Sequence, residues 1–235
     1  LSIDKSLTRL QTDYIDLYQL HWPERKTNFF GQRGFKVQND AWEDNIQNVL
    51  ETLEGFIKQG KIKHIGLSNV TPWGIMRFLE ESKYQNLPKI KTVQNPYSLL
   101  NRTFEMGSAE VCLRENVGLL AYSPMAFGVL SGKFLTGESH PNSRIKLFPQ
   151  FARYNSAQST EATRLYNEIA RKNGLTLTEM SLAFVNQQDF VTSTIIGATT
   201  MEQLKENIAA IDVVLSDEIL KEIDAVQAVI PDPAP

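Results

Sequence analysis

The last apolar segment of the chain ends in residues that could hold an anion. Residues 192–196 have the composition of a buried strand, Gly197 and Thr199 follow, and a helix is expected to come next. A glycine lets the backbone approach a ligand closely, and the free amides of a helix start favour negative charge. The segment therefore predicts a phosphate site. The alternative is simple helix capping, because Thr200 and Gln203 have the spacing of a capping box.

Polar side chains also follow other predicted strands. His21 closes the strand of residues 14–20, where a neutral imidazole could donate a hydrogen bond to a carbonyl oxygen or carry a proton. Ser68, Asn69 and Gln94 end the next two strands, and such groups can jointly satisfy the donors and the acceptor of a carboxamide. The alternatives are a histidine satisfied within the fold and ordinary turn chemistry, which Ser and Asn also favour.

The segment after the strand of residues 118–122 combines an aromatic ring with glycines and cations. Tyr122 could stack on a flat heterocycle, or it could pack in the core. Two glycines precede Lys133, and Arg144 lies further along the same irregular stretch. The two cations could neutralise a pyrophosphate or a ribose phosphate, and the alternative is a solvated loop with scattered charge.

Composition and charge exclude several classes of protein. The 235 residues are 42% hydrophobic and 22% charged, which is typical of a globular domain. The net charge of -3 offers no footprint for nucleic acid or for an anionic membrane, and no apolar run is long enough to span a bilayer. The single Cys112 excludes an internal disulfide and suits a reducing cytoplasm, where we expect the protein. No spacing of metal ligands is present.

Short apolar strands alternate with amphipathic helices along the chain. Strands are predicted over 14–20, 62–67, 90–93, 118–122 and 192–196, and each is followed by at least one helix, which indicates an α/β fold with a parallel sheet. A doubly wound sheet is one alternative, but no Gly-x-Gly-x-x-Gly follows a strand. Polar residues at all five strand ends favour a (β/α)8 TIM barrel, whose chemistry sits at the carboxyl ends of its strands.

We expect a single domain over residues 1–235 that forms an incomplete barrel. Five of eight strands are visible, and the usual barrel length of about 250 residues places roughly 100 more residues ahead of this sequence. Ile3, Leu7 and Leu10 already have helical spacing, so the sequence is expected to begin inside an element.

Helix starts and irregular stretches are also predicted. Thr71 and Pro72 have the chemistry of a capping residue and a first helical position. A further helix is expected over about 105–115. The long stretches 24–43 and 128–157 lack periodicity and are expected to be irregular.

Taken in order, the strand ends resemble the aldo-keto reductase family. Each motif is weak alone, but the ordered set is specific and runs from end to end of the chain. The motifs are Gln19-Leu20-His21-Trp22-Pro23, Gly66-Leu67-Ser68-Asn69, Val93-Gln94-Asn95-Pro96-Tyr97, Ala121-Tyr122-Ser123-Pro124, Gly128-Val129-Leu130-Ser131-Gly132-Lys133, and Ile196-Gly197-Ala198-Thr199-Thr200 through Glu206-Asn207. Residues 21–28, with Phe30 and Gly31, further resemble the bacterial Tas-like branch, which is related to potassium-channel β subunits.

The resemblance implies a (β/α)8 barrel that binds NADP(H) and acts as an NADPH-dependent oxidoreductase, reducing aldehydes or ketones to alcohols. By position, His21 is similar to the histidine that orients the substrate carbonyl. The implied contacts of the nicotinamide are Ser68, Asn69 and Gln94 at its carboxamide and Tyr122 at its ring. The implied contacts of the phosphates and adenine are Ser123, Pro124, Met125, Phe127 and Lys133 at the pyrophosphate, Arg144, Gly197, Thr199 and Gln203 at the 2′-phosphate end, and Glu206 and Asn207 at the adenine.

The family's catalytic groups are an Asp, a Tyr, a Lys and a His, and in this sequence only His21 matches one of them. We therefore expect this chain by itself to lack turnover. One alternative is a non-catalytic NADP(H)-binding module or redox-sensing subunit, and another is a barrel enzyme that uses a different phosphorylated ligand. The expected substrate is a small carbonyl compound, with an apolar wall contributed by Phe29, Phe30, Phe35 and Trp42.

Overall fold

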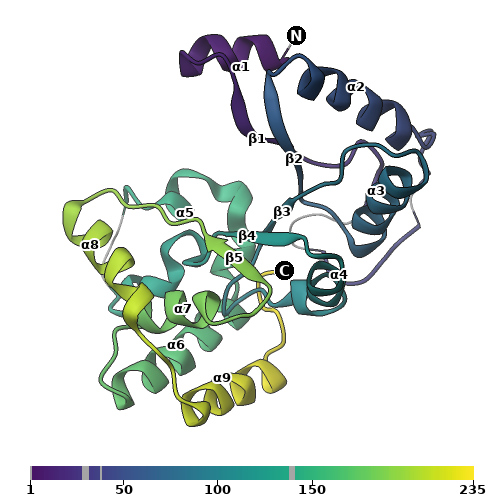
Figure 1. Cartoon of the computed structure of the whole chain (residues 1–235). Coiled ribbons are helices and arrows are strands. Elements are labelled where there is room, and N and C mark those ends of the chain that lie inside the picture. Colours follow the sequence, from purple (N-terminus) through teal and green to yellow (C-terminus); the bar gives the residue numbers. More distant parts are fainter. Residues whose placement is uncertain (1, 28–31, 38, 138–140) are drawn as a thin grey trace. The chain divides into compact units, whose positions relative to one another are not determined.

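The structure is a computed structural model that describes residues 2–27, 32–37, 39–137 and 141–235 (Figure 1). Asn28, Phe29, Phe30 and Gly31, which belong to the predicted substrate wall or to the Tas-like motif, lie outside the described residues. The described strands are β1 (Ile15–Leu20), β2 (Ile62–Ser68), β3 (Thr92–Pro96), β4 (Gly118–Tyr122) and β5 (Val191–Thr194). The described α-helices are α1 (Ser2–Leu10), α2 (Ile46–Lys58), α3 (Pro72–Tyr84), α4 (Ser108–Glu115), α5 (Arg144–Leu147), α6 (Ala157–Lys172), α7 (Leu177–Asn186), α8 (Met201–Ala209) and α9 (Asp217–Val229). Short 3-10 helices are η1 (Thr103–Glu105), η2 (Ala126–Ser131), η3 (Lys133–Leu135), η4 (Pro149–Asn155) and η5 (Ala210–Asp212).

Strands and helices alternate as the sequence predicts, which confirms the α/β class. The strands are hydrogen-bonded in the order β1-β2-β3-β4-β5. β1 and β2 are parallel with Gln19 beside Gly66, and β2 and β3 are parallel with Gly66 beside Thr92 and Ser68 beside Gln94. Parallel neighbours need crossover connections, and the helices between successive strands provide them.

The described residues divide into two compact units. The first holds those within Leu1–Asn28, Gly34–Asn95 and Gly107–Leu119. The second holds Gln32 and Arg33 together with Pro96–Met106 and Leu120–Pro235.

The first unit buries the apolar faces of α2 and α3 together with those of the strands. Leu50 of α2, Ile75 of α3 and Ile65 of β2 are at most 1% exposed. α3 begins as predicted, because the Thr71 hydroxyl accepts a hydrogen bond from the Gly74 amide and Pro72 takes the first helical position. Removing these large side chains from water is the main favourable contribution to folding of this unit.

The second unit is built around α6 and α7, and its carboxyl-terminal segment packs on it. Tyr166, Leu182 and Phe184 are at most 2% exposed. The Ala234 amide donates to the Leu100 carbonyl at 2.9 Å, and the Ser159 hydroxyl donates to the Pro233 carbonyl. These bonds fasten the proline-rich segment after α9 to the unit.

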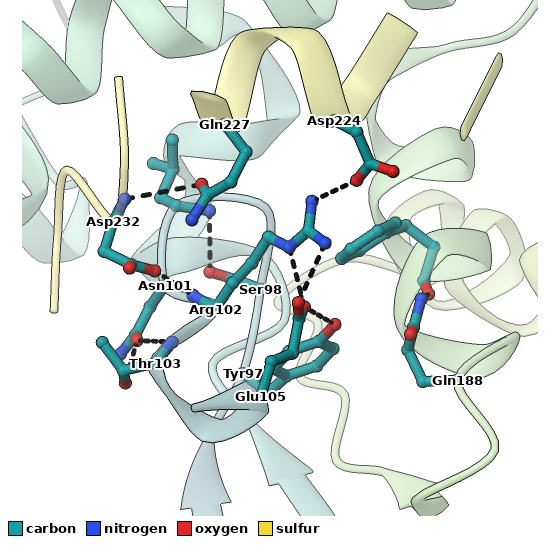
Figure 2. A network of polar contacts seen from close by, with 12 residues as sticks. Tyr97, Ser98, Asn101, Arg102, Thr103, Glu105, Gln188, Asp224, Gln227 and Asp232 are labelled. Carbon is teal, nitrogen blue, oxygen red and sulfur yellow. Dashed lines mark hydrogen bonds and ion pairs between the residues drawn. The ribbon is translucent and has the colours of Figure 1, made fainter. Parts of the chain in front are cut away.

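A network of charged and polar side chains joins the start of the second unit to α9 (Figure 2). Arg102 makes two hydrogen bonds to the Glu105 carboxylate, at 2.7 and 2.9 Å, and a third to Asp224 at 2.7 Å. The Tyr97 hydroxyl donates to Glu105 at 2.6 Å, and the Arg102 amide donates to Asp232 at 2.6 Å. Burial and the Glu105 carboxylate raise the pKa of Tyr97 well above its usual range, so Tyr97 stays a donor.

The structure corrects the prediction for the last strand. β5 ends at Thr194, so residues 195–196 lie outside it, and its residues are exposed or half-buried instead of buried. Ile195 and Ile196 are 40% and 37% exposed. β5 is the last strand in the described order, so only one of its edges pairs with another described strand.

Two further expectations differ in detail. The helix predicted over about 105–115 starts at Ser108, because Gly107 has φ +116° and interrupts the chain after η1. The stretch 128–157 holds η3, α5, η4 and parts of η2, so it is more regular than predicted. No described helix combines the length and the apolar composition needed to cross a membrane.

Candidate active site

A pocket of about 240 Å³ lies in the first unit at the carboxyl ends of β1 and β2. Its lining comes from the ends of these strands, from α2 and α3, and from the segment that follows β1. The lining residues are Leu20, His21, Trp22, Pro23, Glu24, Arg25, Trp42, Asn45, Ile46, Val49, Leu67, Ser68, Val70 and Phe78. Mostly apolar walls with a few convergent polar groups are typical of small-molecule sites.

His21 lines this pocket and lies directly after β1. Its ring stacks on Trp22, with centroids 4.3 Å apart and planes at 23°. Its backbone carbonyl accepts a hydrogen bond from the Asn69 side chain at 2.8 Å. The imidazole is exposed, so the histidine is accessible to a ligand as well as packed beside Trp22.

Ser68, which ends β2, Asn69, which follows it, and Gln94 form one hydrogen-bonded cluster. The strand predicted over 90–93 is β3 at Thr92–Pro96, so Gln94 lies within the strand and not after its end. The Ser68 hydroxyl donates to the Gln94 carbonyl at 2.8 Å, and the Asn69 side chain donates to the Ser68 hydroxyl at 3.1 Å. The parallel register places Ser68 beside Gln94, and Asn69 turns the chain with φ +52°. The structure therefore brings these three predicted residues together.

Arg25, which the sequence reasoning did not select, lines the same pocket. Its guanidinium donates to the Thr71 hydroxyl at 3.0 Å and lies 4.7 Å from the Trp73 ring centroid. Burial lowers the pKa of Arg25, and Asp44 and Asp40 act in the opposite direction. Arg25 stands in a stretch without periodicity, so only tertiary contact identifies it as a lining residue.

The predicted residues after β4 lie on a strained turn in the second unit. Ser123 and Phe127 have φ values of +55° and +57°, which side chains other than glycine rarely adopt. The Met125 carbonyl accepts hydrogen bonds from the Gly128 amide at 2.8 Å and from the Leu130 amide at 3.3 Å, which closes the turn. Tyr122 and Pro124 flank its start, and burial raises the pKa of Tyr122 above its usual range.

Arg144 and Phe127, predicted separately, are in contact. The Arg144 guanidinium lies 4.1 Å from the Phe127 ring centroid, and that ring packs on Tyr154 at 4.7 Å. Stacking on an aromatic face holds an arginine in place while its N–H edge can still meet an anion. Lys133 lies close to the same turn, because a Cβ built on Gly128 would sit 3.3 Å from the lysine Nζ.

The residues around the start of α8 form a second cluster in this unit. Gln203 Oε1 accepts from the Thr199 amide at 2.9 Å and from the Thr199 hydroxyl at 3.0 Å. Thr200 caps the helix by accepting from the Gln203 amide, so capping occurs, but Gln203 does not complete a capping box with Thr200. The Asn207 side chain donates to the Gly197 carbonyl at 3.2 Å.

Glu206 completes the description of the predicted residues in the second unit. Its carboxylate accepts a hydrogen bond from the Thr176 hydroxyl at 2.8 Å. Ile195 donates its amide to the Ala121 carbonyl at 2.8 Å, so the carboxyl ends of β4 and β5 are adjacent. The two predicted segments that follow these strands therefore start at one edge of the sheet.

The local chemistry of the second unit fits a ligand with phosphate groups. Gly128 has no side chain where Lys133 approaches, so the lysine lies directly against the turn backbone. α8 has nine residues and starts at Met201, after the capping Thr200, with amides that favour negative charge. Among the described residues, no group of His, Cys, Asp or Glu side chains is placed to hold a metal ion.

Comparison with known proteins gives consistent results. A model of the aldo/keto reductase family matches residues 1–228. Protein tas of Escherichia coli (strain K12) is 49% identical over 234 residues, which cover 100% of this chain and 68% of that protein. An aldo-keto reductase of Babesia bovis is 38% identical over 220 residues, which cover 88% of this chain and 77% of that protein.

A more distant relative is the L-glyceraldehyde 3-phosphate reductase of Escherichia coli (strain K12). It is 28% identical over 229 residues, which cover 95% of this chain and 61% of that protein. The resemblance first read from the strand-end motifs is thus confirmed by a match over nearly the full chain. The five strands with helices between them are consistent with part of a (β/α)8 barrel. The chain belongs to the aldo/keto reductase family.

Proposed function

We propose that this chain provides NADP(H)-binding residues and the carbonyl-orienting histidine of an oxidoreductase that reduces aldehydes or ketones to alcohols. The observation that carries the proposal is the cluster of Ser68, Asn69 and Gln94 beside His21, at the carboxyl ends of parallel strands. In barrel enzymes the chemistry sits at that edge. The chain spans 68% of its Escherichia coli relative, so the proposal concerns what these residues contribute.

The residues of the first unit would hold the reacting end of the cofactor. NADPH supplies the hydride that reduces the carbonyl. Ser68, Asn69 and Gln94 would bind the nicotinamide carboxamide, for which they offer both donors and acceptors. His21 would donate a hydrogen bond to the carbonyl oxygen of the substrate, which orients it and stabilises developing negative charge.

The residues of the second unit would hold the rest of the cofactor. Tyr122 would stack on the nicotinamide ring. The turn of Ser123, Pro124, Met125 and Phe127, with Lys133, would bind the pyrophosphate. Arg144, Gly197, Thr199 and Gln203 would meet the adenosine 2′-phosphate, and Glu206 and Asn207 would meet the adenine.

A non-catalytic NADP(H)-binding module is the second candidate. The observation behind it is the resemblance of residues 21–28 to the Tas-like branch, which is related to potassium-channel β subunits. The module would bind NADPH without reducing a carbonyl. For either function we propose a cytoplasmic location, which suits the single buried thiol of Cys112.

The test is a titration of the chain with NADPH and with NADH, followed by tryptophan fluorescence. Trp22 and Trp73 are 58% and 49% exposed and report on the first unit. We expect saturable quenching with a preference for NADPH. Arg144→Ala should weaken NADPH by about tenfold and leave NADH nearly unchanged, since one charge-assisted hydrogen bond contributes about 1.5 kcal/mol.

The control for this experiment is Arg171→Ala, which removes an exposed arginine of α6. We expect it to leave both affinities unchanged. Absence of saturable NADPH binding would contradict both candidate functions. Equal losses of NADPH and NADH binding in Arg144→Ala would remove Arg144 from the 2′-phosphate site. Turnover of added carbonyl substrates separates the reductase from the binding module where the family's Asp, Tyr and Lys are supplied together with this chain, because the chain by itself is expected to lack turnover.

A further inference from the structure

We propose that Gln19 is a positioning residue, which holds the side-chain amide of Gln94 so that Gln94 presents its oxygen as the hydrogen-bond acceptor for the bound nucleotide's carboxamide. The inference rests on the proposed function, because it assigns a detail of the same NADP(H) site. It adds a residue that itself touches neither substrate nor cofactor.

The register of β1, β2 and β3 places Gln19 next to the cluster of Ser68, Asn69 and Gln94. Gln19 is the second-last residue of β1, and His21 follows the end of that strand. Gln19 pairs with Gly66, and Gly66 pairs with Thr92. Gln19, Gly66 and Thr92 are therefore neighbours across the sheet. They lie two positions before the paired residues Ser68 and Gln94 along the strands.

Gly66 opens the space through which the two glutamines meet. A Cβ built on Gly66 would sit 2.6 Å from the Thr92 hydroxyl and 3.2 Å from Cγ of Gln19. Any other residue at this position would crowd the path of Gln19 across β2. With glycine at this position, the side-chain nitrogen Nε2 of Gln94 donates a hydrogen bond to the side-chain oxygen Oε1 of Gln19 at 3.2 Å.

This hydrogen bond determines which group Gln94 offers to a ligand. The Gln94 backbone carbonyl is held by the Ser68 hydroxyl at 2.8 Å and by the Asn69 amide at 3.1 Å. With its side-chain nitrogen turned toward Gln19, the Gln94 side-chain oxygen is available as an acceptor. A carboxamide ligand has an NH2 group that can donate to that oxygen.

The polarity of Gln19 is not explained by packing. Its Nε2 is buried and has no hydrogen-bond partner among the described residues. A buried unpaired donor costs about 1–3 kcal/mol, so an apolar residue would be the more stable choice. The Oε1 oxygen of Gln19, however, accepts a hydrogen bond from the Gln94 side-chain nitrogen. This hydrogen bond leaves the Gln94 side-chain oxygen available to accept from a carboxamide.

The test compares two reduced cofactors with the full 235-residue chain. One is NADPH, and the other is its 3-acetylpyridine analogue, in which a methyl ketone replaces the carboxamide and removes the N–H donors. Dissociation constants are measured by tryptophan quenching for the unmodified chain and for Gln19→Met, Gln19→Asn and Gln19→Glu. Gln85→Met, an exposed glutamine at the end of α3, is the matched control.

We expect the unmodified chain and Gln85→Met to prefer NADPH over the analogue. Gln19→Met, and Gln19→Asn with its shorter side chain, should reduce this preference about three- to tenfold through weaker NADPH binding alone. Gln19→Glu still offers an oxygen to the Gln94 amide and should keep the preference.

The outcomes separate the two proposals. If the unmodified chain does not bind NADPH, the proposed function fails. If it binds NADPH and the preference is unchanged in Gln19→Met and Gln19→Asn, or if both cofactors are weakened equally, the positioning role of Gln19 is overturned while the proposed function stands.

Discussion

Left-handed backbone at residues other than glycine occurs in several turns of the described chain, and three such residues lie in the one turn after β4. Asn69, Ser123, Ala126 and Phe127 all have φ between +45° and +57°. Such conformations cost of order 1–3 kcal/mol each when the residue is not Gly, Asn or Asp, and they cluster where geometry serves a ligand. The turn after β4 therefore stores strain at the position where the pyrophosphate is proposed to bind.

Cys112 gives a prediction at the scale of a single side chain. It is 1% exposed in α4, and burial raises its pKa to about 12. The thiolate is the reactive form, so a thiol reagent at pH 8 should leave the folded chain unmodified and should label one thiol per chain in denaturant. Cys112 is the single cysteine, so no other sulfur contributes to the signal.

The same shift has a consequence for stability at alkaline pH. In the folded state the buried thiol stays neutral, whereas in the unfolded state it has its ordinary pKa of 9.0. The contribution of the neutral Cys112 thiol to the free energy of unfolding is therefore fully present below pH 9. It is lost as pH rises from 9 to about 12, where the unfolded state binds fewer protons than the folded state. Rapid labelling of the folded chain at pH 8 would contradict the burial of this thiol.

At the scale of the elements, glycine has opposite roles in a strand and in a helix. Gly66 lies in β2, where a Cβ would sit 2.6 Å from the Thr92 hydroxyl and 3.0 Å from the Thr92 carbonyl oxygen. Gly55 lies within α2, and nothing is found within 4 Å of a Cβ built there. The first glycine is required by close approach between strands, and the second is not.

We therefore predict opposite effects of two Gly→Ala substitutions. Gly66→Ala should lower the free energy of unfolding by about 1–3 kcal/mol, because the added methyl group forces the neighbouring strand to shift. Gly55→Ala should raise it by about 0.5–1 kcal/mol, because alanine is the better helix former. Urea unfolding curves of the two variants give the comparison, and a Gly66→Ala chain as stable as the unmodified one would exclude the crowding.

At the scale of the whole molecule, long-range contacts hold the second unit together. Arg102 lies in the segment after β3, whereas Asp224 belongs to α9 and Asp232 to the segment that follows it (Figure 2). Burial alone would lower the pKa of Arg102, but its hydrogen bonds to Glu105 and Asp224 raise it, so the charge is kept. The network therefore joins residues more than 100 positions apart.

Two arginines differ enough in environment to test this network. The Arg102 side chain is 14% exposed, whereas Arg114 pairs with Glu110 at 76% exposure. Arg102→Met should lower the free energy of unfolding by about 2–3 kcal/mol, because it removes the cation that pairs with the half-buried Glu105 carboxylate, which then keeps only the Tyr97 hydroxyl as a donor. Arg114→Met should change it by less than about 0.5 kcal/mol, as is typical of exposed ion pairs.

Denaturant unfolding followed by circular dichroism measures both changes. Similar small effects of the two substitutions would show that the Arg102 network contributes no more than a surface ion pair. Proteolysis of the segment after α9 measures the loss of the carboxyl-terminal contacts separately. This segment is held by the hydrogen bonds of the Ala234 amide and the Pro233 carbonyl, which follow Asp232 of the network in the sequence.

The order of elements and the identity of the strand-end residues were predictable from the sequence alone. Strand positions follow from short apolar runs, the start of α3 follows from Thr71 and Pro72, and the family follows from motifs that each span a few neighbouring residues. These signals are local, so they can be recognised without knowing what lies across the sheet. Gln19 was within reach of the same reasoning, since it stands in the predicted strand two residues before His21.

Other features were decided by tertiary structure. The contact of Gln19 with Gln94 depends on the register of three strands and on the space above Gly66. The pocket position of Arg25 and the joining of Arg102 to α9 depend on how distant segments pack. The exposure of β5 depends on its place at the end of the strand order. Sequence neighbours determine which element forms, but pairing across the fold determines which side chains meet, because it is set by register, burial and shape.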